Sequence, residues 1–134
     1  YIFRQSTDEN GQGKWKQTAI QLPLVPSLGL QPSLVAKAEN YVLRDGDLLF
    51  WYTDGLLECA NSDDKPLKKN ELFQCLISAL ESDVAEGAPK YRAAVSEKFR
   101  AHVGGRRELE DDVTIVVAKI GRLGAAVQIT KNAA

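Results

Sequence analysis

Residues 46–58 read GDLLFWYTDGLLE, and this stretch decides the fold. Residues 48–52 within it are all apolar and lack the alternation of a strand with one face in water, so they predict a central strand covered on both faces. Turn chemistry at residues 44–47 precedes the strand. It ends at Thr53-Asp54-Gly55, where a carboxylate reaches the rim of the sheet beside a glycine of wide conformational freedom. This rim is a favourable place for a functional site.

A second buried strand is predicted at residues 114–118, which are β-branched and apolar. An acidic group precedes it: Glu108, Glu110, Asp111 and Asp112. If the two strands pair in antiparallel fashion, Asp54 and Asp111-Asp112 converge at one edge of the sheet. Carboxylate oxygens are the ligands that magnesium and manganese prefer. Taken alone, this pattern indicates a metal site only weakly, because acidic residues at strand ends more often serve as turn or capping groups.

The rest of the chain contains signals for a hairpin and two helices. Residues 1–5 and 15–20 flank the polar, glycine-bearing segment 8–13, which predicts the hairpin. Apolar residues recur at helical spacing within 66–80, and a second helix is expected from Pro89 to Gly104-Gly105. We also expect an irregular, proline-rich connection at 22–32, a strand at 34–43, a mobile acidic connector between the helices and a tail of little fixed structure beyond Gly121.

Composition excludes several classes of protein. The 134 residues carry a net charge of −1 with no long block of one sign, so nucleic acid is not an expected partner. Cys59 and Cys75 form no zinc or disulfide pattern, which favours a reducing cytoplasm. No stretch is long and apolar enough to span a membrane. Because the chain lacks methionine and opens as though inside a strand, we expect a fragment of a longer protein, whose other parts could include a membrane anchor.

Two motifs together resemble those of the SpoIIE/RsbU phosphatases. Residues 46–58 are similar to the family signature GDxLxxYTDGxxE, and residues 111–117 (DDVTIVV) are similar to its closing DDxTxxV strand. The order of the motifs, the two helices between them and the leucine-glycine at 28–29 within the proline-rich segment 22–32 also agree. The resemblance covers residues 1–120, the C-terminal part of such a domain, and leaves 121–134 as a tail.

The resemblance implies an α+β fold, an antiparallel β-sandwich flanked by helices, with a metal centre at one edge. By position in the motifs, Asp54 and Asp111 would bind two or more Mn²⁺ or Mg²⁺ ions. Asp112 and Thr114 would orient or brace the site, with Gly55 as a further supporting residue. Glu58 also matches the signature, with a role that is catalytic support or purely structural.

One family motif has no counterpart here. The aspartate followed by glycine-histidine-glycine, which supplies a further bridging carboxylate, is absent, and the sole histidine, His102, lies in the second predicted helix. We therefore expect this fragment to be inactive alone. We also expect it to self-associate, because the N-terminal part of the domain would otherwise cover sheet edges and a core around Phe50, Tyr52 and Val116.

Two functions follow as hypotheses. The first is hydrolysis of phosphoserine or phosphothreonine on a regulatory protein of the anti-sigma-factor antagonist type, by a metal-activated water in a cytoplasmic domain whose parent carries a sensor or receiver domain. No protein nucleophile is needed. The alternative is a non-catalytic, phosphatase-like module that binds a partner, which the missing motif favours. An unrelated α+β domain with coincidental acidic strand ends is a third, weaker reading.

Overall fold

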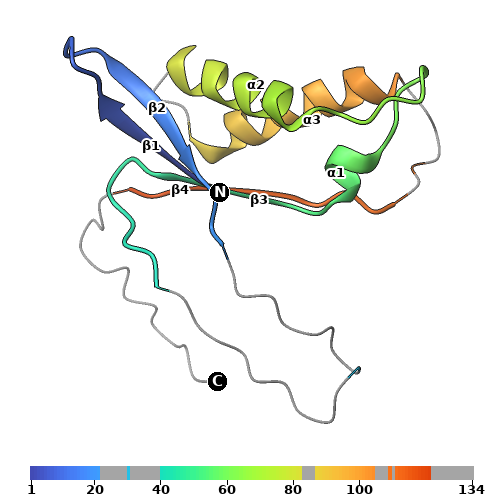
Figure 1. The fold of residues 1–134 in the computed structure, drawn as a ribbon, viewed down its shortest axis with the longest axis horizontal. Helices are drawn as coiled ribbons and strands as arrows, with labels where there is room; N and C mark the ends of the chain where they lie inside the picture. Colours follow the sequence, from blue (N-terminus) through green and yellow to red (C-terminus); the bar gives the residue numbers. More distant parts are fainter. Residues whose placement is uncertain (22–29, 31–39, 83–86, 105–108, 110, 122–134) are drawn as a thin grey trace, which may run out of the picture.

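The computed structural model describes residues 1–21, 30, 40–82, 87–104, 109 and 111–121 (Figure 1). The elements in chain order are β1 (Ile2–Thr7), β2 (Gly13–Thr18), β3 (Leu48–Tyr52), α1 (Gly55–Glu58), α2 (Lys69–Ser82), α3 (Ala88–Val103) and β4 (Ile115–Lys119). The predicted α+β class, with an antiparallel sheet and helices, is confirmed, while the second sheet of the predicted sandwich is not found among the described residues. No helix in this described part is long and apolar enough to cross a bilayer.

The four described strands form one antiparallel sheet in the order β2-β1-β3-β4. The strand predicted to be central, β3, has the predicted bounds and lies between β1 and β4. The predicted antiparallel pairing of the two motif strands is confirmed, with Tyr52 opposite Ile115 and Leu48 opposite Lys119. In this pairing, the C-terminal end of β3 lies beside the N-terminal end of β4.

The predicted hairpin is confirmed as β1 and β2, and its turn is held by one side chain. The Asp8 carboxylate accepts hydrogen bonds from the backbone N–H groups of Asn10 and Gln12 at 2.9 and 2.8 Å. Gly11 takes a φ of 78°, a conformation that favours glycine. Beyond Phe3, β1 pairs only with β2, so the outer part of the hairpin extends past β3.

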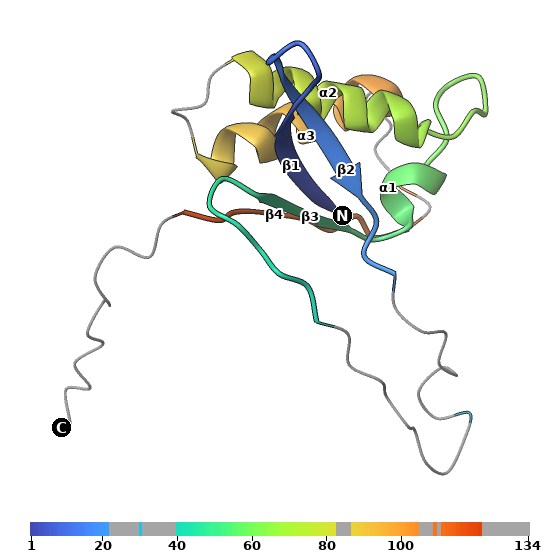
Figure 2. The same ribbon diagram turned by 60° about the vertical axis from the view of Figure 1, so that its left-hand side comes forward.

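The helices α2 and α3 pack together over one face of the sheet, as both ribbon views show (Figures 1 and 2). Alternation along β3 directs Leu48 and Phe50 into this layer, where both are fully buried. Phe73 of α2 meets the rings of Phe3 and Phe50 edge to face, with centroids 5.4 and 6.5 Å apart. Aromatic packing between α2 and the sheet therefore forms the centre of the core.

The opposite face of the sheet carries an exposed apolar pair. Trp51 and Val116 are direct neighbours across β3 and β4, and they are 43% and 46% exposed. The prediction of exposed core residues is thus correct for Val116 and wrong for Phe50, because Phe73 and the rest of the helix layer cover Phe50 completely. Tyr52 is half-buried.

The two long helices follow their predicted starts to different degrees. The second helix is confirmed within one residue at its start, and Gly104 ends it in the left-handed conformation. The first helix begins at Lys69 rather than Pro66, because Pro66 forms a β-bridge with Ala60 and the Leu67 N–H donates to the Leu57 carbonyl. Tertiary pairing there replaces the helical turn that spacing predicted.

Several predictions fall partly or wholly on residues outside the described ranges. The irregular connection at 22–32, the acidic connector after α2 and the tail beyond Gly121 belong to this group. Of the strand predicted at 34–43, only residues 40–43 are described, and they are not in a strand.

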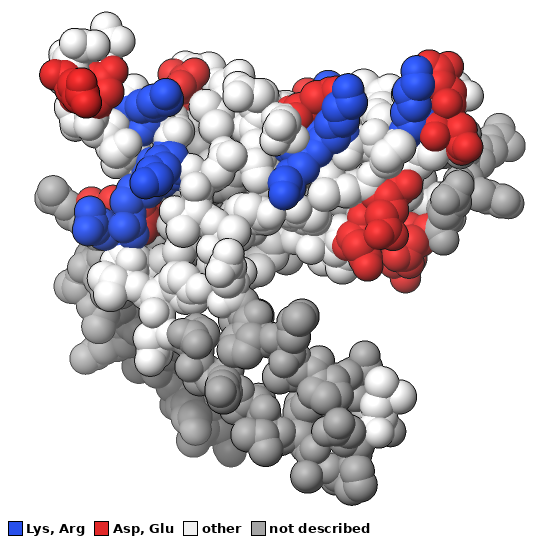
Figure 3. Space-filling model, in the orientation of Figure 1, with Lys and Arg blue, Asp and Glu red and all other residues white. Residues whose placement is uncertain are grey.

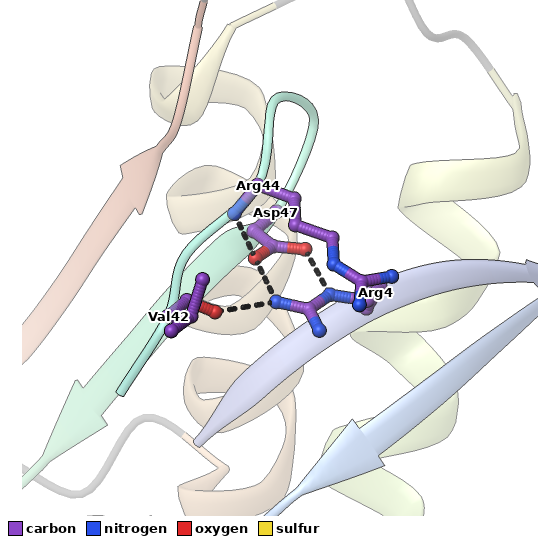
Figure 4. Close-up of polar contacts among 4 residues, drawn as sticks. All are labelled: Arg4, Val42, Arg44 and Asp47. Carbon is purple, nitrogen blue, oxygen red and sulfur yellow. Dashed lines mark hydrogen bonds and ion pairs between the residues drawn. The ribbon is translucent and has the colours of Figure 1, made fainter. Parts of the chain in front are cut away.

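A buried ion pair anchors the start of β3 (Figure 4). Asp47 is 1% exposed, and its carboxylate accepts hydrogen bonds from the Nε and Nη2 atoms of Arg4 at 2.7 and 2.6 Å. It also accepts the backbone N–H of Arg44 at 2.7 Å. The Arg4 guanidinium holds the pKa of Asp47 below its ordinary value, chiefly through these side-chain hydrogen bonds. Arg4 further donates to the Val42 carbonyl, so one side chain joins β1 to the segment entering β3.

Candidate functional site

Asp54 lies where β3 ends and α1 begins. It is the N-cap residue of α1, and its carboxylate accepts the backbone N–H of Gly55 at 3.1 Å. An aspartate suits this position because its side chain can accept one of the helix's unpaired N–H groups. The side chain is exposed, so a carboxylate oxygen stays accessible at the end of the sheet.

The segment that leads into β4 brings Asp111 and Asp112 to the same end. Both residues are exposed, and the Asp111 carboxylate accepts the N–H of Asp112 at 2.7 Å. Thr53 joins this segment to the end of β3 through three hydrogen bonds. Its backbone N–H donates to the Thr114 carbonyl at 3.2 Å, its hydroxyl donates to the Asp112 carbonyl at 3.0 Å, and its hydroxyl oxygen accepts the Thr114 N–H at 2.9 Å.

Gly55 permits the close approach of the two motifs. A Cβ placed on this buried glycine would lie 2.7 Å from the Asp112 carbonyl oxygen and 3.3 Å from the Asp111 Cβ. The first of these distances is shorter than a Cβ can tolerate against a backbone oxygen. The lack of a side chain at Gly55 therefore allows Asp111-Asp112 to pass directly beside Asp54-Gly55.

A cavity of about 420 Å³ adjoins Asp54 and Glu58. Its walls also include the aromatic residues Tyr1, Phe50, Trp51 and Tyr52. Burial, with the neighbouring Tyr1, raises the pKa of Tyr52 to about 12. The Tyr52 phenol is therefore protonated near neutral pH, so it serves as a neutral polar group in the wall and not as a base.

The structure thus places the predicted site residues at one end of the sheet and along α1. Gly55, Asp111 and Asp112 lie in direct proximity, while Thr114 takes part through its backbone N–H and C=O. Asp54 adjoins this group through Gly55, and Glu58 lies one helical turn further along α1, beside the cavity. Acidic side chains gather on the molecular surface next to α1 (Figure 3).

The carboxylates of the described residues do not make a complete cation cage. No group of three or more His, Cys, Asp or Glu side chains in that part of the chain is arranged to hold a metal ion. Exposed carboxylates are nevertheless oxygen donors of the type that hard cations take. Asp54 and Asp111 therefore fit part of a ligand set, and further ligands would have to join them.

Sequence reasoning missed two residues in this architecture. Asp47, expected to be a turn residue, is the buried partner of Arg4, and Thr53 is the residue that joins the two motifs. Thr53 had no local signal for this role, because its hydroxyl bonds residues 59 and 61 positions away in the sequence. Asp47 had none, because Arg4 lies far from it in the sequence.

The structure is an α+β fold whose antiparallel motif strands bring acidic residues to one end of the sheet. The family model described as Stage II sporulation protein E (SpoIIE) matches residues 8–121, well over half of the chain. The chain therefore belongs to the SpoIIE family. No curated protein and no solved structure shows significant similarity to it.

Proposed function

We propose that this chain supplies part of the divalent-cation centre of a protein serine/threonine phosphatase. Asp54 and Asp111 would be the cation ligands, with Gly55, Asp112, Thr114 and Glu58 in support. The ion would be Mn²⁺ or Mg²⁺, two or more in a complete centre. The substrate class is a phosphorylated regulatory protein of the anti-sigma-factor antagonist type. Self-association through the exposed Trp51 and Val116 face is part of the same proposal.

One observation supports this proposal most directly. The two family motifs are separate in the sequence, yet Thr53 joins them side by side, and Gly55 leaves no side chain between them. A bound divalent cation would supply charge neutralisation at phosphoryl oxygens and a water of lowered pKa. This chain's residues would hold Asp54 directly after β3 and Asp111 in the segment before β4, where each could contribute an oxygen to the same ion.

A binding module without catalysis is the second candidate. It is favoured by the finding that the described carboxylates form no group of three able to hold an ion. In that case the cavity beside Asp54 and Glu58 would recognise a partner without changing it. The two candidates differ in whether Asp54 and Asp111 act together on a cation.

Titration of the isotope-labelled chain with Mn²⁺ tests the shared cation region. Paramagnetic broadening of amide signals is expected first at Asp54, Gly55, Asp111 and Asp112. Asp54→Asn should weaken the apparent Mn²⁺ affinity at least about tenfold, because one charged oxygen donor is lost. Asp63→Asn is the matched control, since Asp63 is an exposed carboxylate in the loop before α2. Broadening spread evenly over all exposed carboxylates, or unchanged in Asp54→Asn, would contradict the proposal.

Phosphate release from a phosphoserine peptide tests catalysis by the chain alone. We expect little or no Mn²⁺-dependent release, because an incomplete ligand set positions neither the ion nor the attacking water. Release at an ordinary enzymatic rate, abolished by Asp54→Asn, would show instead that the 134 residues contain a complete centre. If Asp54→Asn released phosphate as fast as the parent chain, the Asp54 carboxylate would have no part in the reaction.

A further inference from the structure

We propose that Thr53 is a positioning residue whose hydroxyl sets the distance between the Asp54 and Asp111 segments. The proposal concerns a side chain that is not among the ligands assigned above. Only the expected effect of Thr53 on cation binding rests on the proposed function. The geometry itself stands on the hydrogen bonds of the described residues.

The first step is what happens to the backbone of Thr53. Tyr52 and Ile115 are the last paired residues of β3 and β4, and Thr53 and Thr114 lie opposite each other just beyond them. The Thr53 N–H still donates to the Thr114 carbonyl, but the Thr53 carbonyl accepts the N–H of Leu56 in the turn that starts α1. The antiparallel ladder therefore loses the acceptor that would normally bond the Thr114 N–H.

The second step is that the Thr53 hydroxyl replaces this acceptor. Its oxygen accepts the Thr114 N–H at 2.9 Å, and its proton is donated to the Asp112 carbonyl at 3.0 Å. A hydroxyl can do both at once, whereas a methyl group can do neither. The two strands thus stay joined for one more residue while the main chain of β3 turns away into α1. A β-branched residue suits this task because its χ1 angle is restricted.

The third step connects this bond to the carboxylates. The carbonyl that Thr53 binds is that of Asp112, and the same oxygen lies 2.7 Å from the position of a Cβ on Gly55. Thr53 therefore draws the Asp111-Asp112 segment toward the turn, and Gly55 leaves the space for it. Asp54 and Asp111 take their relative position from this contact. Without the hydroxyl, only the bond from the Thr53 N–H to the Thr114 carbonyl would still join Thr53 to the segment before β4.

Three variants of the chain test the role of the hydroxyl. Thr53→Val keeps the shape and removes the hydroxyl, Thr53→Ser keeps the hydroxyl, and Thr18→Val makes the same change at an exposed position at the end of β2. In Thr53→Val, we expect exchange of the Thr114 amide proton to quicken by about fivefold, from the loss of one hydrogen bond. Thr53→Ser and Thr18→Val should stay within about twofold of the parent chain. If Thr53→Val does not fold, Thr53→Ala is compared with Thr53→Ser.

A second measurement reports the carboxylate segments directly. A nuclear Overhauser effect between the Gly55 Hα and Asp111 Hβ protons is expected in the parent chain and in Thr53→Ser, and it should weaken in Thr53→Val. If Thr53→Val keeps both the Thr114 protection and this contact, the proposal is wrong. Mn²⁺ titration of the same samples separates the two hypotheses. Loss of the contact with no Mn²⁺ effect in any variant leaves Thr53 as a positioning residue and overturns the cation centre.

Discussion

Replacing Asp47 with alanine is expected to lower the free energy of unfolding by about 3 kcal/mol, because the substitution removes the three hydrogen bonds of a carboxylate that is itself almost fully buried. This loss of stability lies at the low end of the range for removing one partner of a buried ion pair. Arg4 is partly exposed and can be hydrated after its partner is lost, whereas the Arg44 N–H is left without this acceptor. Urea unfolding at pH 7 measures the effect.

Asp63→Ala is the matched control for this substitution. Asp63 also faces a lysine, at 3.8 Å, but both side chains are largely exposed, so the expected change is at most about 0.5 kcal/mol. Equal effects of Asp47→Ala and Asp63→Ala would contradict the stabilising role of the buried pair.

The same pair predicts a dependence of stability on pH. Because the folded-state pKa of Asp47 is lowered, the contribution of the pair is fully present above the unfolded pKa, near 4. It is lost as the pH falls further, through the folded-state value. The difference in stability between the parent chain and Asp47→Ala should therefore shrink below about pH 4. A difference that stays constant down to pH 2 would refute this assignment.

Replacing Gly55 with alanine is expected to cost about 2 kcal/mol, because the new Cβ would lie 2.7 Å from a backbone oxygen that can yield only if the Asp112 segment moves. The helical preference of alanine over glycine, about 1 kcal/mol, opposes this cost and is smaller. Unfolding measurements give the stability, and the amide shifts of Asp111 and Asp112 report the displacement.

Gly13→Ala separates steric overlap from the loss of a glycine as such. A Cβ on Gly13 would also lie 2.7 Å from its nearest neighbour, but that neighbour is the amide end of the Gln5 side chain, which can rotate away. We expect a change within about 0.5 kcal/mol. If Gly55→Ala is as mild as Gly13→Ala, the close passage of the two motifs does not depend on this glycine.

Much of the fold could be predicted from the sequence, because its strongest signals are local. The apolar run 48–52 gave a strand with correct bounds, and Pro89 and Gly104 marked the ends of α3 to within a residue. The four-residue helix α1 was not predicted, because it is too short to show periodicity. The early start assigned to α2 has a different cause: the bridge at Pro66 depends on contacts that spacing does not reveal.

The candidate site was predictable only in part. The residue types at the ends of two strands showed which carboxylates could meet, and pairing of those strands brings their segments together. How they are held could not be predicted, because the Thr53 hydroxyl acts on residues about sixty positions away. The Arg4–Asp47 pair is equally non-local, with partners 43 residues apart. Bonds of this kind depend on the folded arrangement, not on neighbouring sequence.

The link between Thr53 and Asp112 spans 59 residues, and α1, α2 and α3 all lie inside that loop. Closing so long a loop costs chain entropy before its contacts can repay it, so pairing of β3 with β4 should come late in folding. We therefore expect the two halves of the acidic region to meet only after the helices between them have packed. Any ligand binding there would then report the fraction of molecules that have completed folding.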